Sequence, residues 1–483
     1  MKGKYSIPLL FYRSWANLEG ISSIDDLLDW INFLNKISSV DIRKITLSDS
    51  CFWFFDKYSG QIINKNKGFF RISGLKYEKA NGECIGQPII IQDEIGYLGI
   101  LCKVINGSLY FLMQAKIEPG NINKIQLSPT LQATKSNFTQ KHGGKKPDFL
   151  DFFINASKHT IIVDQLQSEQ SSRFFKKRNR NIIVMVSEET IVEIPQSYKW
   201  LTLGQIKTLM RYNNLINMDT RTVLSCIPYS SFRLTDDERK EVHKLFKDQA
   251  LFLSIVENET ENPDSRVYSY INNHKMFSET SAILTPLGDL KDWVITNDEI
   301  ICTHPYPFKV VFCDITIDGR EVKKWTQPML EASGKAFFGL FTAVFNGVRK
   351  FLVHAQDEIG CFDKIELGPS VQLEFRCCDK NWNVIEKLFF KKYLEKKDIL
   401  YDVILSEEGG RFFHEQNNNA IIELDESELV ENKLVQPSVN FRNNAETLPE
   451  GYFWLTYNTL NRYIQYNNCL NIQLRNLLSL MEI

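Results

Sequence analysis

Apolar side chains recur at helical spacing in two long segments of the chain, residues 22–37 and 234–256. Each segment opens with a serine or threonine that lies three residues before an acidic residue, as Ser23 does before Asp26. This pairing is the capping box that begins many helices. We therefore predict an amphipathic helix in each segment. The apolar positions within residues 203–210 have the same spacing and predict a further helix.

Short apolar runs, bounded by glycine, asparagine, proline or charged residues, lie between these helices and predict β-strands. They occupy residues 99–105, 109–117, 159–166, 181–187, 336–345, 349–356 and 419–424. Helices and strands that follow one another in this way predict an α/β or α+β fold.

The second part of the chain repeats the first in the same order. The matching segments are 110–132 with 350–372, 168–184 with 406–422, and 200–225 with 454–479. An ordered series of matches indicates a duplication rather than a local coincidence. Pro228 and the serines after it interrupt the pattern. We therefore predict two domains, 1–227 and 228–483, each with a lead helix, a sheet and a closing helix.

Composition narrows the class of protein. The 43% hydrophobic and 24% charged residues in 483 are typical of a globular chain, and a net charge of -2 argues against nucleic-acid binding by bulk electrostatics. The apolar runs are shorter than the roughly 20 residues that cross a bilayer, so no membrane role is expected. The ten cysteines show no CxxC pair, and the first residues lack the apolar core of a signal peptide. We expect a cytoplasmic protein with reduced thiols.

A dense set of polar residues follows the second predicted strand. Lys116 and Glu118 alternate with apolar residues, so both point to one face of the strand and could act on a proton. Amide and hydroxyl groups suited to a sugar or a base edge follow at Asn121, Gln126, Ser128, Gln132 and Asn137. The alternative is a loop whose polar groups bond to each other. A basic segment comes next, in which His142 precedes Gly143-Gly144, and it is either a ligand loop or merely a basic surface loop.

Residues 173–180, RFFKKRNR, concentrate positive charge in a nearly neutral protein. Because guanidinium groups bind phosphate oxygens in pairs, this cluster is a candidate diphosphate site. A charged strand edge is the other interpretation. The matching residues 411–419 have lost most of the charge, so the two halves should not bind anions equally. Metal and cofactor sites are not expected, because no HExxH, P-loop or strand-borne GxGxxG motif occurs.

Three segments resemble the diagnostic blocks of the NDP-hexose 2,3-dehydratases, enzymes of deoxysugar biosynthesis. They are residues 114–144, 166–184 and 198–228. The resemblance implies a tandem pair of Nudix-hydrolase-like α/β/α sandwich modules that form a homodimer. It also implies a substrate such as dTDP-4-keto-6-deoxy-D-glucose, from which water leaves across C2 and C3 without a cofactor. The product, a 3,4-diketo-2,6-dideoxy sugar, would pass to a 3-ketoreductase.

The resemblance suggests roles for residues of both halves. Glu118 or His142 would carry protons, Lys116 would bond the carbonyl oxygen, and the amides and Ser128 would contact sugar or nucleotide. The expected diphosphate contacts are Arg173, Lys177, Arg178 and Arg180. Candidates for a second, degenerate site are His354, Glu358, Asp363, Glu366, Arg411 and His414. Here the chain departs from the family pattern, with Glu358-Ile359-Gly360 in place of Glu-Pro-Gly.

Two other functions remain open from the sequence. A Nudix-type sugar-nucleotide hydrolase would share the implied fold, but it needs a helical glutamate cluster for metal, which the chain lacks. A non-catalytic protein that binds nucleotide sugars is the second alternative, since fold alone does not fix function.

Overall fold

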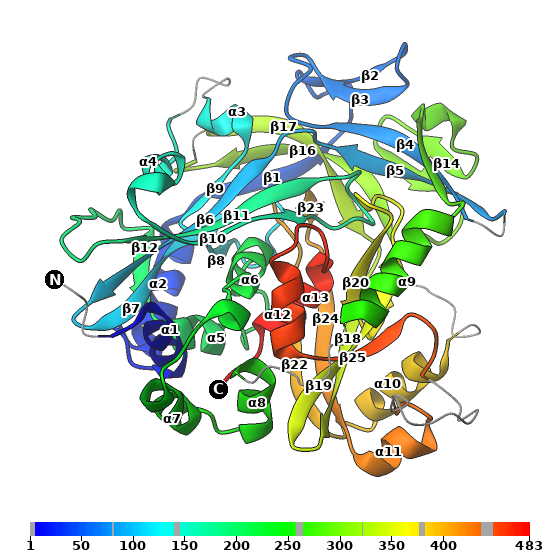
Figure 1. Ribbon diagram of the computed structural model, residues 1–483. Coiled ribbons are helices and arrows are strands. Elements are labelled where there is room, and N and C mark those ends of the chain that lie inside the picture. Colours follow the sequence, from blue (N-terminus) through cyan, green and yellow to red (C-terminus); the bar gives the residue numbers. More distant parts are fainter. Residues whose placement is uncertain are drawn as a thin grey trace.

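The computed structural model describes residues 5–79, 82–139, 145–256, 264–320, 322–375, 382–435 and 448–483. Within these residues four β-sheets and the helices form a mixed α/β architecture (Figure 1). The mixed class confirms the coarse prediction from the sequence. The predicted strands all occur, and the segment around Gly99, for example, lies in a strand of ten residues.

Two seven-stranded sheets share one pairing pattern. The first has the order β10 (Thr160–Ser168), β11 (Arg178–Val186), β6 (Gly96–Ile105), β7 (Ser108–Ile117) and β12 (Tyr198–Leu201), with β8 (Ile125–Ser128) on β7 and β9 (Leu131–Ala133) on β6. The second contains β22 (Ile399–Ser406), β24 (Gln416–Leu424), β18 (Phe337–Phe345), β19 (Val348–Asp357) and β25 (Tyr452–Thr456), with β20 (Ile365–Pro369) on β19 and β21 (Val371–Leu373) on β18. In each, the equivalent pair, β11 with β6 and β24 with β18, is parallel.

Two smaller sheets exchange strands across residue 227. The five-stranded sheet contains β2 (Trp53–Asp56), β3 (Gln61–Asn64), β4 (Arg71–Glu78), β5 (Cys84–Ile91) and, from the second half, β13 (Ser281–Thr285). The six-stranded sheet contains β14 (Trp293–Ile295), β15 (Glu299–Cys302), β16 (Phe308–Ile317), β17 (Lys324–Ala332), β23 (Phe412–Phe413) and, from the first half, β1 (Val40–Ile45). Each half therefore completes a sheet of the other, and a cut at residue 227 would remove one strand from each small sheet.

The helices mostly follow the apolar pattern of the sequence. They are α1 (Ile7–Ala16), α2 (Ile24–Ile37), α3 (Lys135–Phe138), α4 (Leu150–Ile154), α5 (Leu203–Leu209), α6 (Met218–Ser225), α7 (Asp236–Leu245), α8 (Gln249–Val256), α9 (Asp264–Phe277), α10 (Val384–Leu394), α11 (Glu426–Glu431), α12 (Tyr457–Ile464) and α13 (Ile472–Ser479). The predicted capping box of Ser23 and Asp26 begins α2. The segment 234–256 is two helices rather than one, because Phe246 is extended and the carboxylate of Asp248 accepts the Leu251 amide at the start of α8.

Helices α6 and α13 pack against each other between the two large sheets (Figure 1). Each carries a buried arginine that reaches into the other half. The Arg221 guanidinium donates to the Ser406 carbonyl at 2.7 Å, and the Arg475 guanidinium donates to the Ser168 carbonyl. These carbonyls end β22 and β10, directly before Glu407 and Glu169. The central helices thus hold the loop after each of these strands against the opposite half.

Two glycines let these loops cross at close range. The Gly120 amide donates to the Gly409 carbonyl at 2.7 Å, and the Gly360 amide donates to the Ser171 carbonyl at 2.9 Å. A Cβ at position 120 would lie 1.6 Å from the Phe412 carbonyl oxygen, and one at position 360 would lie 2.1 Å from that of Phe174. Neither position has room for a side chain, because the obstacle is backbone.

We expect Gly120→Ala to lower the free energy of unfolding by about 1–3 kcal/mol or more, because overpacking against backbone forces the two loops apart. Gly360→Ala should cost somewhat less, since its clash is milder. Urea denaturation of both variants measures the effect. Gly288→Ala is the matched control, because a Cβ there meets no described atom within 4 Å. Equal midpoints for all three variants would contradict the close crossing of the loops.

Candidate active site

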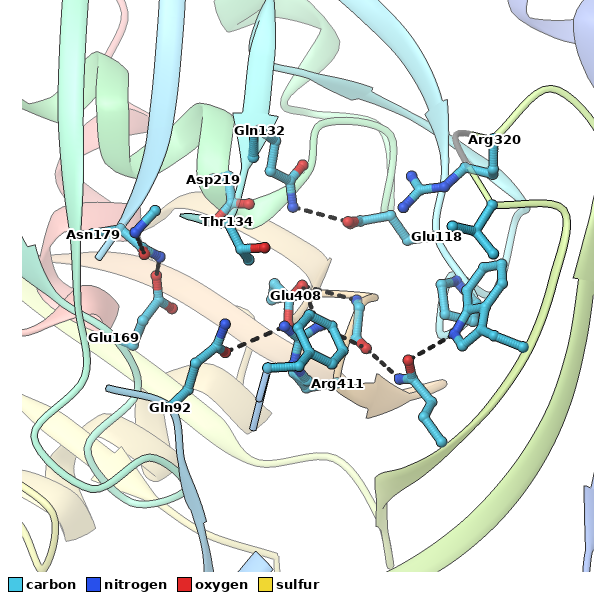
Figure 2. Close-up of a pocket in the computed structure, with 18 of the residues that line it drawn as sticks. Gln92, Glu118, Gln132, Thr134, Glu169, Asn179, Asp219, Arg320, Glu408 and Arg411 are labelled. Carbon is cyan, nitrogen blue, oxygen red and sulfur yellow. Dashed lines mark hydrogen bonds and ion pairs between the residues drawn. The ribbon is translucent and has the colours of Figure 1, made fainter. Parts of the chain in front are cut away.

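A cavity of about 420 Å³ opens where the first large sheet meets both small sheets. Its walls come from β6, β7 and β9, from the strand regions of β2 and β17, and from the loop between β22 and β23 (Figure 2). That loop belongs to the second half of the chain, so the cavity is built by both halves. It is large enough for part of a nucleotide sugar and is rich in charged side chains.

The inner wall carries the proton-handling residues predicted from the sequence. Lys116, in β7, and Glu118, just after it, both line the cavity, as their alternation in the sequence predicts. The Lys116 ammonium lies 3.7 Å from Oε1 of Glu118, and the Gln132 amide donates to the same oxygen at 2.8 Å. Oε2 of Glu118 is buried without a hydrogen-bond partner among the described residues. One carboxylate oxygen is therefore held in place while the other is available to a ligand.

Three further carboxyl groups line the same cavity. Glu169 follows β10, Asp219 lies in the first turn of α6, and Glu408 enters from the second half (Figure 2). Burial raises the pKa of Glu408 to about 7, although the Arg411 guanidinium opposes the shift. Burial likewise raises the pKa of Glu169 and raises that of Asp219 well above its ordinary value. Burial therefore favours the neutral form of all three carboxyl groups.

Two cations balance this charge from opposite halves. The Lys177 ammonium donates to the Glu94 carbonyl, and burial lowers the pKa of Lys177 to about 8. The Arg411 guanidinium stacks 4.4 Å from the ring centre of Phe69 and donates to Oε1 of Gln92 at 3.2 Å. Its nearest recorded carboxylate oxygen, in Glu408, is 4.0 Å away. An anionic ligand oxygen in the cavity therefore has an arginine that is not closely paired with a carboxylate.

The outer rim differs from the inner wall in exposure and chemistry. Its aromatic rings come from Phe52, Phe69 and Trp325, and Val322 is 37% exposed. Arg320 and Lys324 add positive charge, and the Lys324 side chain is 66% exposed. By contrast, Lys116 and Glu118 are 7% and 3% exposed. The rim thus suits a planar ring and phosphate groups, and the interior suits chemistry shielded from water.

The predicted cationic cluster of residues 173–180 is divided among several places. Lys177 lines the cavity, whereas the Arg173 guanidinium pairs with Glu374 at 2.9 Å in the opposite region. Arg178 stacks 3.9 Å from the ring centre of Phe362, and Arg180 pairs with Asp164 at 2.5 Å. The structure therefore does not bring the four cations together in one diphosphate site. Three of them, Arg173, Arg178 and Arg180, have partners outside the cavity.

The predicted polar contacts of the first half mostly support the cavity from behind. Gln126 accepts the Ser406 hydroxyl at 3.0 Å, and Ser128 accepts the Asn217 amide at 2.9 Å. The Asn121 amide donates to the Lys124 carbonyl at 2.9 Å. Among the described side chains of this set, Gln132 alone lines the cavity. Asn137 lies in α3, but its side chain is outside the described residues, as is His142 altogether.

The second-half candidates separate in the same way. Arg411 was expected in a second site, but it lines the cavity described above. It does so because its loop crosses from the second half to the first. His354 stacks 4.0 Å from the ring of Tyr452, and burial lowers the pKa of His354 to about 4. Asp363 pairs with Lys275, and His414 stacks on Phe413 at 4.2 Å. Neither histidine lines the cavity described above.

Glu358 and Glu366 of the second half lie within electrostatic range of each other, and Arg173 lies within range of Glu358. The Gln372 amide donates to Glu358 at 2.6 Å, as Gln132 does to Glu118. Burial raises the pKa of Glu358 to about 8 and that of Glu366 to about 7. The residues equivalent to Lys116 and Lys177 are Gln356 and Glu415. This region therefore lacks two cations of the open cavity and holds its own arginine between carboxylates.

Sequence reasoning missed several residues that line the cavity. They are Gln92, Glu169, Asn179, Asp219, Arg320, Lys324 and Glu408. A signal for two of them was present in the repeats: Asp219 matches Gln473, and Glu408 matches Gln170. A difference between repeats at an otherwise matched position marks a residue that only one half needs. In the part of the chain that the structure describes, no group of His, Cys, Asp and Glu suits a metal ion, and no helix is long and apolar enough to span a membrane.

Comparison with known proteins agrees with this geometry. The sequence model of the family described as NDP-hexose 2,3-dehydratase matches residues 24–227 and 264–481. A protein of Saccharopolyspora spinosa, named dTDP-4-dehydro-6-deoxy-alpha-D-glucopyranose 2,3-dehydratase, is 36% identical over 450 residues, which cover 92% of this chain and 88% of that protein. Proteins of the same name from Amycolatopsis orientalis and Streptomyces violaceoruber are 33% and 34% identical, over 96% and 91% of this chain and 92% of each relative. These matches run through both halves, and the chain belongs to the NDP-hexose 2,3-dehydratase family.

Proposed function

We propose that this chain removes water across C2 and C3 of a nucleoside-diphosphate 4-keto-6-deoxyhexose, with dTDP-4-keto-6-deoxy-D-glucose as the first substrate to test. The observation that carries the proposal is the buried Lys116, Glu118 and Gln132 constellation at the closed end of a cavity with a cationic, aromatic rim. The names of the three relatives support the same reaction and the same nucleotide.

The chemistry needs little more than proton transfer and one stabilised oxyanion. The C4 ketone makes the C3 hydrogen acidic, and the C2 hydroxyl lies β to that carbonyl. Glu118 takes the C3 proton with its unpartnered oxygen, while the Lys116 ammonium donates to the enolate oxygen at C4. Loss of the C2 hydroxyl gives an enol, which ketonises to the 3,4-diketo-2,6-dideoxy sugar. Each positioned group contributes roughly 10²- to 10⁴-fold to the rate.

The exposure and charge of the cavity walls support one orientation of the bound substrate. The hexose occupies the inner end, where exclusion of water strengthens the contacts of Lys116 and Glu118. The nucleotide base lies at the rim against Phe69 or Trp325, since aromatic faces stack on bases. Arg411 and Lys177 on one side, with Arg320 and Lys324 at the rim, meet the diphosphate between them. Substrate specificity thus depends on residues from both halves.

The product formed in D₂O tests the reaction directly. We expect the purified chain to convert dTDP-4-keto-6-deoxy-D-glucose to a product lighter by one water, with solvent deuterium at C2 after ketonisation. Reduction with a 3-ketoreductase and NADPH traps the labile diketone for mass spectrometry. Release of a sugar phosphate in a chelator-sensitive reaction would instead indicate a Nudix-type hydrolase, and unchanged sugar that still binds would indicate a binding protein.

We also propose the finer architecture implied by the family resemblance. Residues 1–227 and 228–483 form two Nudix-hydrolase-like modules, the first with the working site and the second with a degenerate one. The shared pairing pattern of the large sheets and the loss of Lys116 and Lys177 equivalents in the second half support this view. We further propose a homodimer, delivery of product to a 3-ketoreductase, and a cytoplasmic location in keeping with the free thiols of the described cysteines.

A further inference from the structure

Asp219 is a buried acid that the reaction scheme above leaves unused. It lines the cavity from the first turn of α6 and is 2% exposed. Its Oδ1 atom is buried and has no hydrogen-bond partner among the described residues. Burial of a carboxyl oxygen that lacks a hydrogen-bond partner favours the neutral form of the group, in which it can donate a proton.

The groups that face Asp219 favour this neutral form. Electrostatic contributions to its ionisation come from the carboxyl groups of Glu118, Glu169 and Glu408, which disfavour it, and from the Lys116 ammonium, which favours it. Arg221 and Arg475 also lie within electrostatic range. After burial, the three carboxyl groups raise its pKa furthest. The start of α6 opposes this tendency, because the helix dipole favours a negative charge in the first turn.

The duplicated chain contains its own comparison. At the position equivalent to Asp219, α13 carries Gln473, and at the position equivalent to Glu408 the first half carries Gln170. By contrast, Glu118 and Glu169 keep carboxyl equivalents in Glu358 and Glu407. The acid pair of Asp219 and Glu408 therefore belongs to the open cavity alone. Glu408 lines the same cavity as Asp219 because its loop crosses from the second half.

We propose, on the basis of the proposed function, that Asp219 is the catalytic acid that protonates the departing C2 hydroxyl. Glu118 first removes the C3 proton, and the C3–H electrons form the C3–C4 enolate, whose oxygen accepts from the Lys116 ammonium. The enolate electrons then form the C2–C3 double bond as the C4 carbonyl returns and the C2–O bond breaks. The Asp219 proton moves to the departing oxygen, which leaves as water. In ketonisation the enol O3 proton returns to Asp219, C2 takes a proton from solvent, and Glu118 gives its proton to solvent.

With Asp219 as the acid, removal of the C3 proton and departure of the C2 oxygen depend on different residues, so the two steps can be measured separately. In Asp219→Asn the base and the C4 oxygen contact remain, so the C3 hydrogen of the substrate should still exchange with D₂O while elimination falls roughly 10²- to 10⁴-fold. Fluoride leaves without a proton from an acid. A dTDP-4-keto-6-deoxy sugar with fluorine in place of the C2 hydroxyl should therefore lose fluoride in the Asp219→Asn protein. The rate should be nearly the rate that the unsubstituted chain shows with the same sugar. Gln473→Asn, the matched change on α13, should leave all three reactions unchanged.

Turnover of the hydroxyl substrate by the unsubstituted chain first establishes the proposed function on its own. With that in place, loss of C3 exchange together with elimination in an Asp219→Asn protein that still binds dTDP would overturn the assignment, as would normal turnover. The unsubstituted chain provides a test that does not depend on the variant folding. Its kcat should fall at alkaline pH with the hydroxyl substrate, as an essential acid ionises, and this fall should be absent with the fluoro substrate. The same alkaline fall with both substrates would also overturn the proposal.

Discussion

Glu118→Gln is expected to abolish exchange of the C3 hydrogen and elimination together, with kcat lower by roughly 10²- to 10⁴-fold. Glutamine keeps the shape of the side chain and can still bond to Gln132, but it cannot accept the C3 proton. The fluoro substrate should not restore activity, since the lost step precedes departure of the C2 group. Deuterium incorporation at C3, followed by mass spectrometry, measures the first step apart from the second.

Glu358→Gln is the matched control for this experiment. Glu358 occupies the equivalent position, and the Gln372 amide donates to it at 2.6 Å. It lies among the carboxyl groups around Arg173, where burial raises its pKa to about 8. We expect Glu358→Gln to retain turnover, because no lysine equivalent to Lys116 stands beside it. An inactive Glu358→Gln enzyme together with an active Glu118→Gln enzyme would instead place the reaction in the second half.

The sequence predicted the long strands β6, β7, β10, β11, β18, β19 and β24 of the large sheets because their patterns are local. Apolar runs such as residues 109–117 need no distant information to be read as strands. The exchange of β1 and β13 was not predictable in this way. β1 has mostly half-buried and exposed residues, and its ladder pairs Ile42 with Ile315. Which sheet accepts such an edge strand depends on loop closure between distant parts of the chain.

The site was predictable to the extent that its residues are neighbours in sequence. Lys116 and Glu118 lie at the end of β7, and Gln132 lies on β9, which pairs with the neighbouring strand β6. Arg411 and Arg173 were assigned to sites in their own halves because their neighbours in sequence lie there. In the structure, each side chain contacts residues of the opposite half. Neighbours in a charged run can also face different partners. Lys177 faces the cavity, whereas Arg178, one residue later, stacks on Phe362 of the second half.

Arg411 and Arg173 should therefore respond to the same substitution in opposite ways. Arg411→Met removes the loosely paired cation of the cavity, so KM for the nucleotide sugar should rise roughly 10- to 100-fold, the equivalent of one charged hydrogen bond. Arg173→Met should leave KM and kcat near their original values. Steady-state kinetics with the two variants checks this, and a large rise in KM for Arg173→Met alone would place the anion site in the second half.

Stability should show the reverse order, since Arg173 is the one that is paired with carboxylates. Its guanidinium lies 2.9 Å from Glu374 and 3.8 Å from Glu415, whose side chain is 2% exposed. Removing one member of a buried pair costs about 3–5 kcal/mol when the other stays charged.

The pH dependence of this cost follows from two buried glutamates. Burial raises the pKa of Glu415 to about 8 and that of Glu407 to about 7, whereas an unfolded glutamate has a pKa of 4.5. The folded state therefore binds more protons than the unfolded state between pH 4.5 and pH 8. Stability from these groups is therefore lost as pH rises, and without Arg173 the loss should steepen. Urea denaturation of Arg173→Met should give a deficit that grows from pH 6 to pH 8, and a deficit independent of pH would mean that Arg173 acts by packing rather than by charge.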